Sequence, residues 1–147
     1  MIDSKWIGAV TSDFEADVEK GQLRFFAKAV GENDPVYTDE SAARAAGYPS
    51  LPAPPTFLFT LNLAQPDPLG KYIRMGVDLA KLLHGSQDFE YHAPICAGDR
   101  IRLKSHISDI VEKKGGALVL LVEETSATNQ RGESVGKSVQ TLVIRNV

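Results

Sequence analysis

The sequence has little cysteine, no long apolar run and no excess of positive charge. Cys96 is the only cysteine among the 147 residues, so no disulfide can form within the chain, as is usual in a reducing compartment. The formal net charge of −3 argues against binding to nucleic acid or to an anionic membrane surface. The opening stretch MIDSKWIGAV has neither a basic start nor a long apolar segment, so it predicts no signal peptide and no membrane span. A cytoplasmic protein is therefore expected.

Motifs for metals and cofactors are also missing. His84, His92 and His106 lack the close spacing of metal ligands and have no cysteine cluster beside them, so the sequence predicts no metal site. The chain contains no G-x-S-x-G elbow, no phosphate-binding loop and no dinucleotide fingerprint. We therefore expect no cofactor.

The second half of the chain has the pattern of an antiparallel sheet. A hydrophobic content of 43% in a chain of this length suffices for the core of one domain spanning residues 1–147. Alternating apolar and polar residues with glycine-rich turns predict strands at residues 12–18, 88–92, 101–110, 117–127 and 135–144. A break in the alternation at Ile110 predicts a bulge near Ser108 and Asp109. Residues 118–122 are apolar on both faces, which indicates a strand covered on both sides.

Helices are expected mainly in the first half. Apolar residues recur at helical spacing from Leu23 to Val30, and a second, alanine-rich helix begins at Thr38 as N-cap and ends at Gly47. A third helix, between Pro55 and Pro66, is apolar on nearly every side and must therefore be buried. Residues 69–83 predict a loop with a short strand or helical turn. A buried helix followed by strands predicts an α+β fold, although this periodicity alone also suits other α+β folds.

The stretch GENDPVYTDESAARAAGY carries a family signature. It resembles the loop G-D-x-N-P-L-H and the following alanine-rich helix of the MaoC-like, (R)-specific enoyl-thioester hydratases and dehydratases. Gly31, Pro35 and Val36 match this signature, and so does the small-residue helix. The resemblance implies a single hotdog fold, in which a curved antiparallel sheet wraps around a buried central helix.

The two catalytic positions of the signature differ. Glu32 stands where the family has its catalytic Asp, and Tyr37 stands where it has the catalytic His. A tyrosine with a pKa of about 10 is a poor base at neutral pH, whereas a histidine near ~6.5 exchanges protons readily. Such a pattern is similar to the non-catalytic hotdog of two-part members, including the acyl-binding, HadA-like subunit of (3R)-hydroxyacyl-ACP dehydratases. Whether this chain is an enzyme by itself stays open.

The resemblance also implies a thioester-binding site. In the family, backbone N–H groups at the start of the central helix polarise the thioester carbonyl, a role that falls here near Pro54, Pro55, Thr56 and Phe57. Because prolines have no N–H, the first usable amide is that of Thr56. His84 either lines the thioester channel or is a hydrogen-bonded residue at the start of a strand. A coenzyme A or acyl carrier protein ligand would carry a phosphorylated pantetheine arm. The candidate cations for binding its phosphate are Arg100, Arg102, Lys104, Lys71 and Arg74.

These observations predict a subunit of an (R)-specific 3-hydroxyacyl-thioester dehydratase or enoyl-thioester hydratase. The chain would bind acyl-CoA or acyl carrier protein, while a partner hotdog supplies the catalytic Asp and His. Exposed edges of an antiparallel sheet favour pairing into a homodimer or heterodimer. Two alternatives remain: a self-sufficient homodimeric hydratase or thioesterase that uses Glu32, and a non-catalytic acyl-thioester binding protein.

Overall fold

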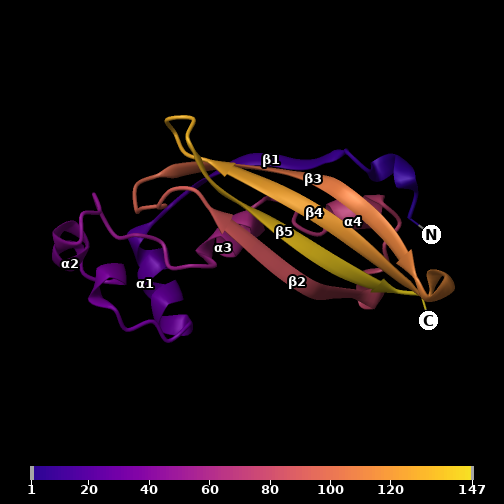
Figure 1. Cartoon of the computed structure of the whole chain (residues 1–147), viewed down its shortest axis with the longest axis horizontal. Helices are drawn as coiled ribbons and strands as arrows, with labels where there is room; N and C mark the ends of the chain where they lie inside the picture. Colours follow the sequence, from indigo (N-terminus) through magenta and orange to yellow (C-terminus); the bar gives the residue numbers. More distant parts are fainter. Residues whose placement is uncertain (1, 147) are drawn as a thin grey trace.

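The computed structural model describes residues 2–146, which form one five-stranded antiparallel sheet with helices against one face and beyond one end of it (Figure 1). The order of strands across the sheet is β1-β3-β4-β5-β2. The strands are β1 (Val10–Asp17), β2 (Leu82–Tyr91), β3 (Arg100–Lys113), β4 (Leu118–Thr128) and β5 (Ser134–Arg145). β3, β4 and β5 are joined as successive hairpins, as predicted, and the register shift between Ile107 and Asp109 confirms the bulge.

The helices are short. They are α1 (Lys20–Ala29), α2 (Glu40–Ala45), α3 (Phe57–Leu63) and α4 (Gly70–Arg74), with 3-10 turns at Ser4–Trp6, Pro35–Tyr37, Leu79–Lys81 and Lys114–Gly116. The ambiguous stretch 69–83 thus contains α4, a 3-10 turn and the start of β2. With ten residues, α1 is the longest helix of the described chain, and no helix there is long and apolar enough to cross a membrane.

The second helix begins one residue later than the sequence predicts. Asp39 is its N-cap, and the Asp39 carboxylate accepts a hydrogen bond from the backbone N–H of Ser41 at 2.8 Å. Thr38 instead ends the preceding 3-10 turn, where its N–H donates to the carbonyl of Pro35. Thr38 therefore cannot cap α2, because it already belongs to the turn before it.

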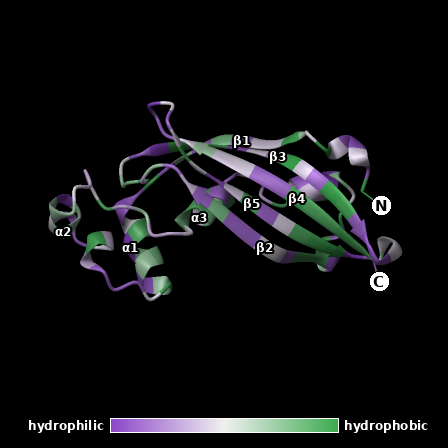
Figure 2. Ribbon diagram, viewed as in Figure 1, coloured by the Kyte–Doolittle hydropathy of each residue, from purple (hydrophilic) through white to green (hydrophobic). Residues whose placement is uncertain are grey.

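One face of the sheet packs against the helices. Alternate residues of β4 from Val119 to Ala127 point to this face and are buried. Leu118, Leu120 and Val122 point to the opposite face and are half-buried. The predicted cover on the helix side is thus present, whereas cover of the opposite face by a partner or another layer stays a prediction. Figure 2 shows hydrophilic residues along the middle of β2 and hydrophobic ones at its start.

The central helix is buried on one side only. Phe57, Leu58, Leu61 and Asn62 of α3 are buried against the sheet, whereas Leu63 is 52% exposed. The expectation of a helix buried all round is therefore wrong. The reason is that α3 lies beside β2, at the open edge of the sheet, so the side of α3 that faces away from the sheet is in contact with solvent.

The buried apolar side chains fall into two clusters. The first apolar cluster comprises Val18, Leu23, Ala43, Leu51, Phe57, Leu58, Leu61, Ile95, Ile101, Leu103, Ala127 and Val135. The second apolar cluster comprises Ile2, Tyr72, Met75, Val77, Ile107, Val119, Leu121, Leu142 and Ile144. The first surrounds α3 and the second lies under α4, so the core is divided along the strands.

Candidate functional site

A cavity of about 350 Å³ lies where the 3-10 turn at 35–37, the segment before α3 and the end of β2 meet. Apolar groups such as Pro55 and Leu58 form most of its wall. The polar part of the wall comes from Tyr37, Tyr48, Tyr91 and His92. A mostly apolar cavity with a few polar side chains is the usual form of a small-molecule site.

The loop from Gly31 to Tyr37 is fixed by its own carboxylates. The Glu32 carboxylate accepts a hydrogen bond from the Asp34 N–H at 3.0 Å, and the Asp34 carboxylate accepts one from the Val36 N–H at 3.0 Å. Gly31 supplies a positive φ of 73°, which is unfavourable for residues with a side chain. The loop thereby places the Tyr37 ring in the cavity wall, while the Glu32 carboxylate is bound to the turn.

The Tyr37 phenol is a hydrogen-bond donor in this site. Burial raises the pKa of Tyr37 above its ordinary value, and the nearby charges of Glu32, Tyr48 and Asp34 raise it further. A phenol with a raised pKa keeps its proton at neutral pH, so it can donate to a carbonyl oxygen but cannot act as a general base there.

The amide of Thr56 is aimed at Tyr91. Thr56 has the left-handed φ of 74°, and its N–H donates to the Tyr91 hydroxyl oxygen at 2.8 Å. The next amide, Phe57, donates to the carbonyl of Pro54 at 3.1 Å. The Tyr91 hydroxyl accepts from Thr56 and still has its own proton to donate into the cavity. Sequence reasoning identified Thr56 but missed Tyr91, which only the fold brings to this amide.

His92 is held at both ring nitrogens. Its Nδ1 lies 2.6 Å from the Ser134 hydroxyl, and its Nε2 lies 2.8 Å from a Glu90 carboxylate oxygen. The ionised Glu90 can only accept, so in the neutral ring Nε2 carries the proton and Nδ1 accepts from Ser134. The bond from His92, together with Lys137, holds the pKa of Glu90 below its usual range. Sequence spacing gave no sign of this arrangement, because Ser134 is 42 residues from His92.

Two of the other predicted site residues lie away from the cavity. The His84 ring packs against Phe59 at 5.6 Å between centroids, and its Nε2 lies 3.1 Å from the Gln87 side-chain oxygen. Phe57 is 1% exposed and makes an edge contact with Phe26 in the core. The cavity thus brings together Tyr37, Pro54 and Pro55, with the Thr56 amide bonded to a residue of its wall. Their roles in binding or catalysis stay predictions.

Most of the cations suggested for phosphate binding already have acidic partners. Arg102 pairs with Asp13 at 2.7 Å, and Arg100 pairs with Asp17 at 3.2 Å across β1 and β3. Arg74 pairs with an aspartate in the preceding turn. Within residues 2–146, no group of three acidic, histidine or cysteine side chains could hold a metal ion.

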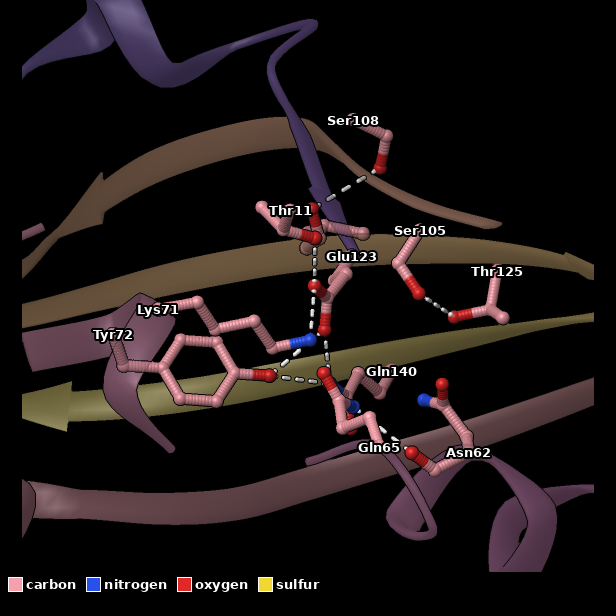
Figure 3. Close-up of polar contacts among 11 residues, drawn as sticks. Thr11, Asn62, Gln65, Lys71, Tyr72, Ser105, Ser108, Glu123, Thr125 and Gln140 are labelled. Carbon is pink, nitrogen blue, oxygen red and sulfur yellow. Dashed lines mark hydrogen bonds and ion pairs between the residues drawn. The ribbon is translucent and has the colours of Figure 1, made fainter. Parts of the chain in front are cut away.

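A buried polar belt separates the two apolar clusters. We use this name for Asn62, Gln65, Lys71, Ser105, Glu123, Thr125, Ser138 and Gln140, all of which are buried. At its centre the Glu123 carboxylate, with no exposed surface, accepts hydrogen bonds from Lys71 at 2.6 Å and Tyr72 at 2.8 Å (Figure 3). Thr11 and Gln140 also donate to Glu123.

Comparison with known proteins places this geometry in a family. The model of the FAS1-like dehydratase domain region matches residues 5–138. A curated protein of Saccharopolyspora erythraea, named only as a UPF0336 protein, is 36% identical over 145 residues, which cover 98% of this chain and 92% of that protein.

Solved structures show the same fold. A chain of the C-terminally truncated HadBC (3R-hydroxyacyl-ACP dehydratase) complex from Mycobacterium tuberculosis is 30% identical and has a TM-score of 0.71, over 88% of this chain and 90% of that one. A MaoC-like dehydratase is 26% identical with a TM-score of 0.80; the match covers 92% of this chain but 42% of that protein. The predicted hotdog fold and the resemblance to MaoC-like dehydratases are thereby confirmed. The chain belongs to the FAS1-like dehydratase-region family of hotdog proteins.

Proposed function

We propose that this chain is the acyl-binding half of a two-hotdog, (R)-specific 3-hydroxyacyl-thioester dehydratase or enoyl-thioester hydratase. The observation that carries the proposal is Tyr37, a protonated phenol in the cavity wall at the position of the family's catalytic histidine. A partner hotdog with the intact Asp and His would bind and activate the water that adds to, or leaves, the conjugated double bond.

The cavity supports binding of the thioester. Its apolar wall at Pro55 and Leu58 suits the carbons next to the carbonyl. The Tyr91 hydroxyl, which accepts the Thr56 N–H, is polarised as a donor toward a carbonyl oxygen. Such a donor stabilises the negative charge that grows on that oxygen in the transition state.

The open edge of the sheet supports a partner. β2 ends the strand order and offers unpaired backbone groups along one side. Leu83, at the start of β2, is 49% exposed. Leu63 of α3 is 52% exposed and lies one helical turn after Phe59, whose ring contacts His84 of β2, so it is a second exposed apolar residue near this edge. Pairing with β2 of a second hotdog would cover these groups and continue the sheet.

The geometry gives less support to a self-sufficient enzyme that uses Glu32. The Glu32 side chain accepts the Asp34 amide within its own loop and is not among the residues that line the cavity. A general base must lie within hydrogen-bond reach of the proton that it takes.

The test is the native mass of the protein isolated from its own cells, followed by reconstitution. We expect a complex with a hotdog chain that bears Asp-x-Asn-Pro-x-His, and turnover of enoyl-CoA only when both chains are present. A homodimer that turns over alone, and loses this activity in Glu32→Gln, would establish the self-sufficient enzyme instead. Micromolar thioester binding without turnover in any complex would establish a binding protein.

A further inference from the structure

We propose that Arg24 of α1 binds the phosphate of a pantetheine arm beside the cavity. The inference rests on the proposed function and adds to it the residue that recognises the charged part of the thioester, whether coenzyme A or a carrier protein presents it. Two observations carry it: the guanidinium lies next to the cavity wall, and it forms no ion pair with an acidic side chain within residues 2–146.

The cations that the sequence suggests for this phosphate are already engaged. The three arginines among them pair with aspartates. Lys71 is 3% exposed and bonded inside the polar belt, so it cannot meet a ligand that arrives from solvent. Lys104 stands directly opposite Asp13 where β3 pairs with β1. The phosphate therefore needs another cation, one that lies nearer to the cavity.

Other basic side chains without an ion pair in the described part of the chain lie far from the cavity. Lys113 ends β3, Lys114 begins the turn that follows, and Arg145 ends β5, all at the end of the sheet opposite to α1 (Figure 1). Lys81 lines a different, smaller cavity of about 150 Å³. Among these side chains, those at the end of the sheet where β2 reaches the 350 Å³ cavity belong to α1.

Arg24 is fixed beside the cavity wall. Its Nε–H donates to the backbone carbonyl of Thr38 at 3.0 Å, and Thr38 directly follows Tyr37, whose ring lines the cavity. Standard backbone dimensions put this Nε at most about 9 Å from the Cα of Tyr37. An extended pantetheine arm separates its thioester from its phosphate by on the order of 15 Å. Because Tyr37 and Tyr91 line the same cavity, such an arm can join a thioester at Tyr91 to a phosphate at Arg24.

The guanidinium has donors left for a phosphate. With Nε bound to Thr38, both terminal nitrogens keep their N–H groups, and no side chain within residues 2–146 accepts from them. A planar pair of N–H groups matches two oxygens of one phosphate. The bond to Thr38 already restrains the side chain, so less rotamer freedom is lost when the phosphate binds.

The neighbouring carboxylates are bound to groups other than Arg24. Those of the loop before α2 accept backbone N–H groups of the same loop, and the Asp39 carboxylate caps α2. Glu40 forms ion pairs with a lysine and with an arginine. Lys28 is exposed one helical turn after Arg24 and adds a second positive charge on this side of α1. A phosphate at Arg24 therefore meets two cations whose charges are not taken up by these acids.

The experiment is calorimetric titration of the full chain with octanoyl-CoA, octanoyl-phosphopantetheine and octanoyl-pantetheine, which lacks the phosphate. The first ligand represents coenzyme A, and the second represents the arm that a carrier protein presents. We expect Arg24→Gln to weaken the binding of both about tenfold, as for a charge-assisted hydrogen bond, and to leave that of octanoyl-pantetheine unchanged. The tenfold difference should shrink at high salt, because the site is exposed.

Arg102→Gln, the same change at an arginine that is paired with Asp13, is the matched control and should leave all three affinities unchanged. Arg24→Lys keeps the charge without the planar fork and should bind more tightly than Arg24→Gln but less tightly than wild type. It also serves as the test variant if Arg24→Gln does not fold.

Three results would overturn the inference and leave the proposed function intact. They are equal affinity of wild type for octanoyl thioesters with and without the phosphate, an equal loss with octanoyl-pantetheine in Arg24→Gln, and a loss with octanoyl-CoA alone, which would place Arg24 at the nucleotide. Absence of binding of every thioester to wild type would overturn the proposed function itself.

Discussion

Thr56 is the residue at which backbone strain and the site coincide. A non-glycine residue in the left-handed region is disfavoured, and Thr56 holds this conformation with an exposed side chain while its amide bonds to Tyr91. We expect Thr56→Gly to raise the free energy of unfolding by about 1 kcal/mol, because glycine adopts this φ without a steric penalty. Urea denaturation measures the change. In the control Thr60→Gly, inside α3, we expect a loss of about 1 kcal/mol, and a loss in both variants would contradict strain at Thr56.

Tyr91 tests the carbonyl-binding role of the cavity. Its hydroxyl is the one group that links the Thr56 amide to the cavity interior. We expect Tyr91→Phe to weaken the binding of octanoyl-CoA by about fivefold, equivalent to about 1 kcal/mol for one neutral hydrogen bond. Calorimetry on the folded variant gives the result. Unchanged affinity would mean that the carbonyl binds elsewhere.

At the level of elements, the Glu123 network joins segments that the sequence separates. The carboxylate on β4 bonds to Lys71 of α4, to Gln140 of β5 and to Thr11 of β1. α4 has only five residues and cannot be stable by itself, so these bonds and the second apolar cluster hold it on the sheet.

This network should show strong coupling between its two charges. We expect Lys71→Met to lower the free energy of unfolding by about 3–5 kcal/mol, because it leaves the Glu123 charge buried without a cation. The double variant Lys71→Met with Glu123→Gln should be more stable than the single Lys71 variant, since no charge remains buried. A double-mutant cycle in urea measures the coupling. Simply additive costs would show that the pair does not act as a unit.

At the level of the whole molecule, the exposed β2 edge should control assembly. If β2 is the interface, a charge at Leu83 would be buried against the partner without a counterion. We therefore expect Leu83→Asp to shift the native mass to that of the single chain in sedimentation. Phe25→Asp on α1, where the ring is 75% exposed, is the matched control and should leave the mass unchanged. Dissociation by Phe25→Asp instead of Leu83→Asp would place the interface on α1.

The pH range of stability follows from both ends of the titration. The pKa values of Asp13 and Glu40 are lowered, chiefly by hydrogen bonds from Arg102 and Lys20 respectively. These two carboxylates therefore stabilise the folded state at pH values above their unfolded-state pKa values. This stabilisation is lost as the pH falls through their lower, folded-state pKa values. The pKa of Tyr72 is raised, chiefly by burial and further by Glu123. Protonated Tyr72 therefore stabilises the folded state below about pH 10, the pKa of an unfolded tyrosine, and this stabilisation is lost as the pH rises above that value.

We therefore expect a plateau of thermal stability between these limits, measured by calorimetry. In Tyr72→Phe the decline above about pH 10 should be shallower than in wild type, because the phenol that must ionise on unfolding is gone. An alkaline decline of equal steepness in both proteins would assign it to other groups.

Much of the fold was predictable because its signals are local. Apolar and polar residues that alternate along the strands, with glycine-rich turns between them, predicted the hairpins of β3, β4 and β5. The order of strands was not predictable, because β2 pairs with β5, some fifty residues later in the chain, and no local pattern selects that neighbour.

The sequence by itself determined the family to which the chain belongs. It also determined that the site lacks the family's histidine base. Tyr37 stands in place of the histidine, and a phenol with an ordinary pKa of about 10 is a poor base at neutral pH even before the fold raises that pKa. Only the tertiary structure decided that the Tyr91 hydroxyl meets the Thr56 amide, that Ser134 and Glu90 hold His92, and that Glu123 is buried with Lys71. These contacts join residues far apart in the chain, and their strength depends on burial, which exists only after the sheet has closed over the helices.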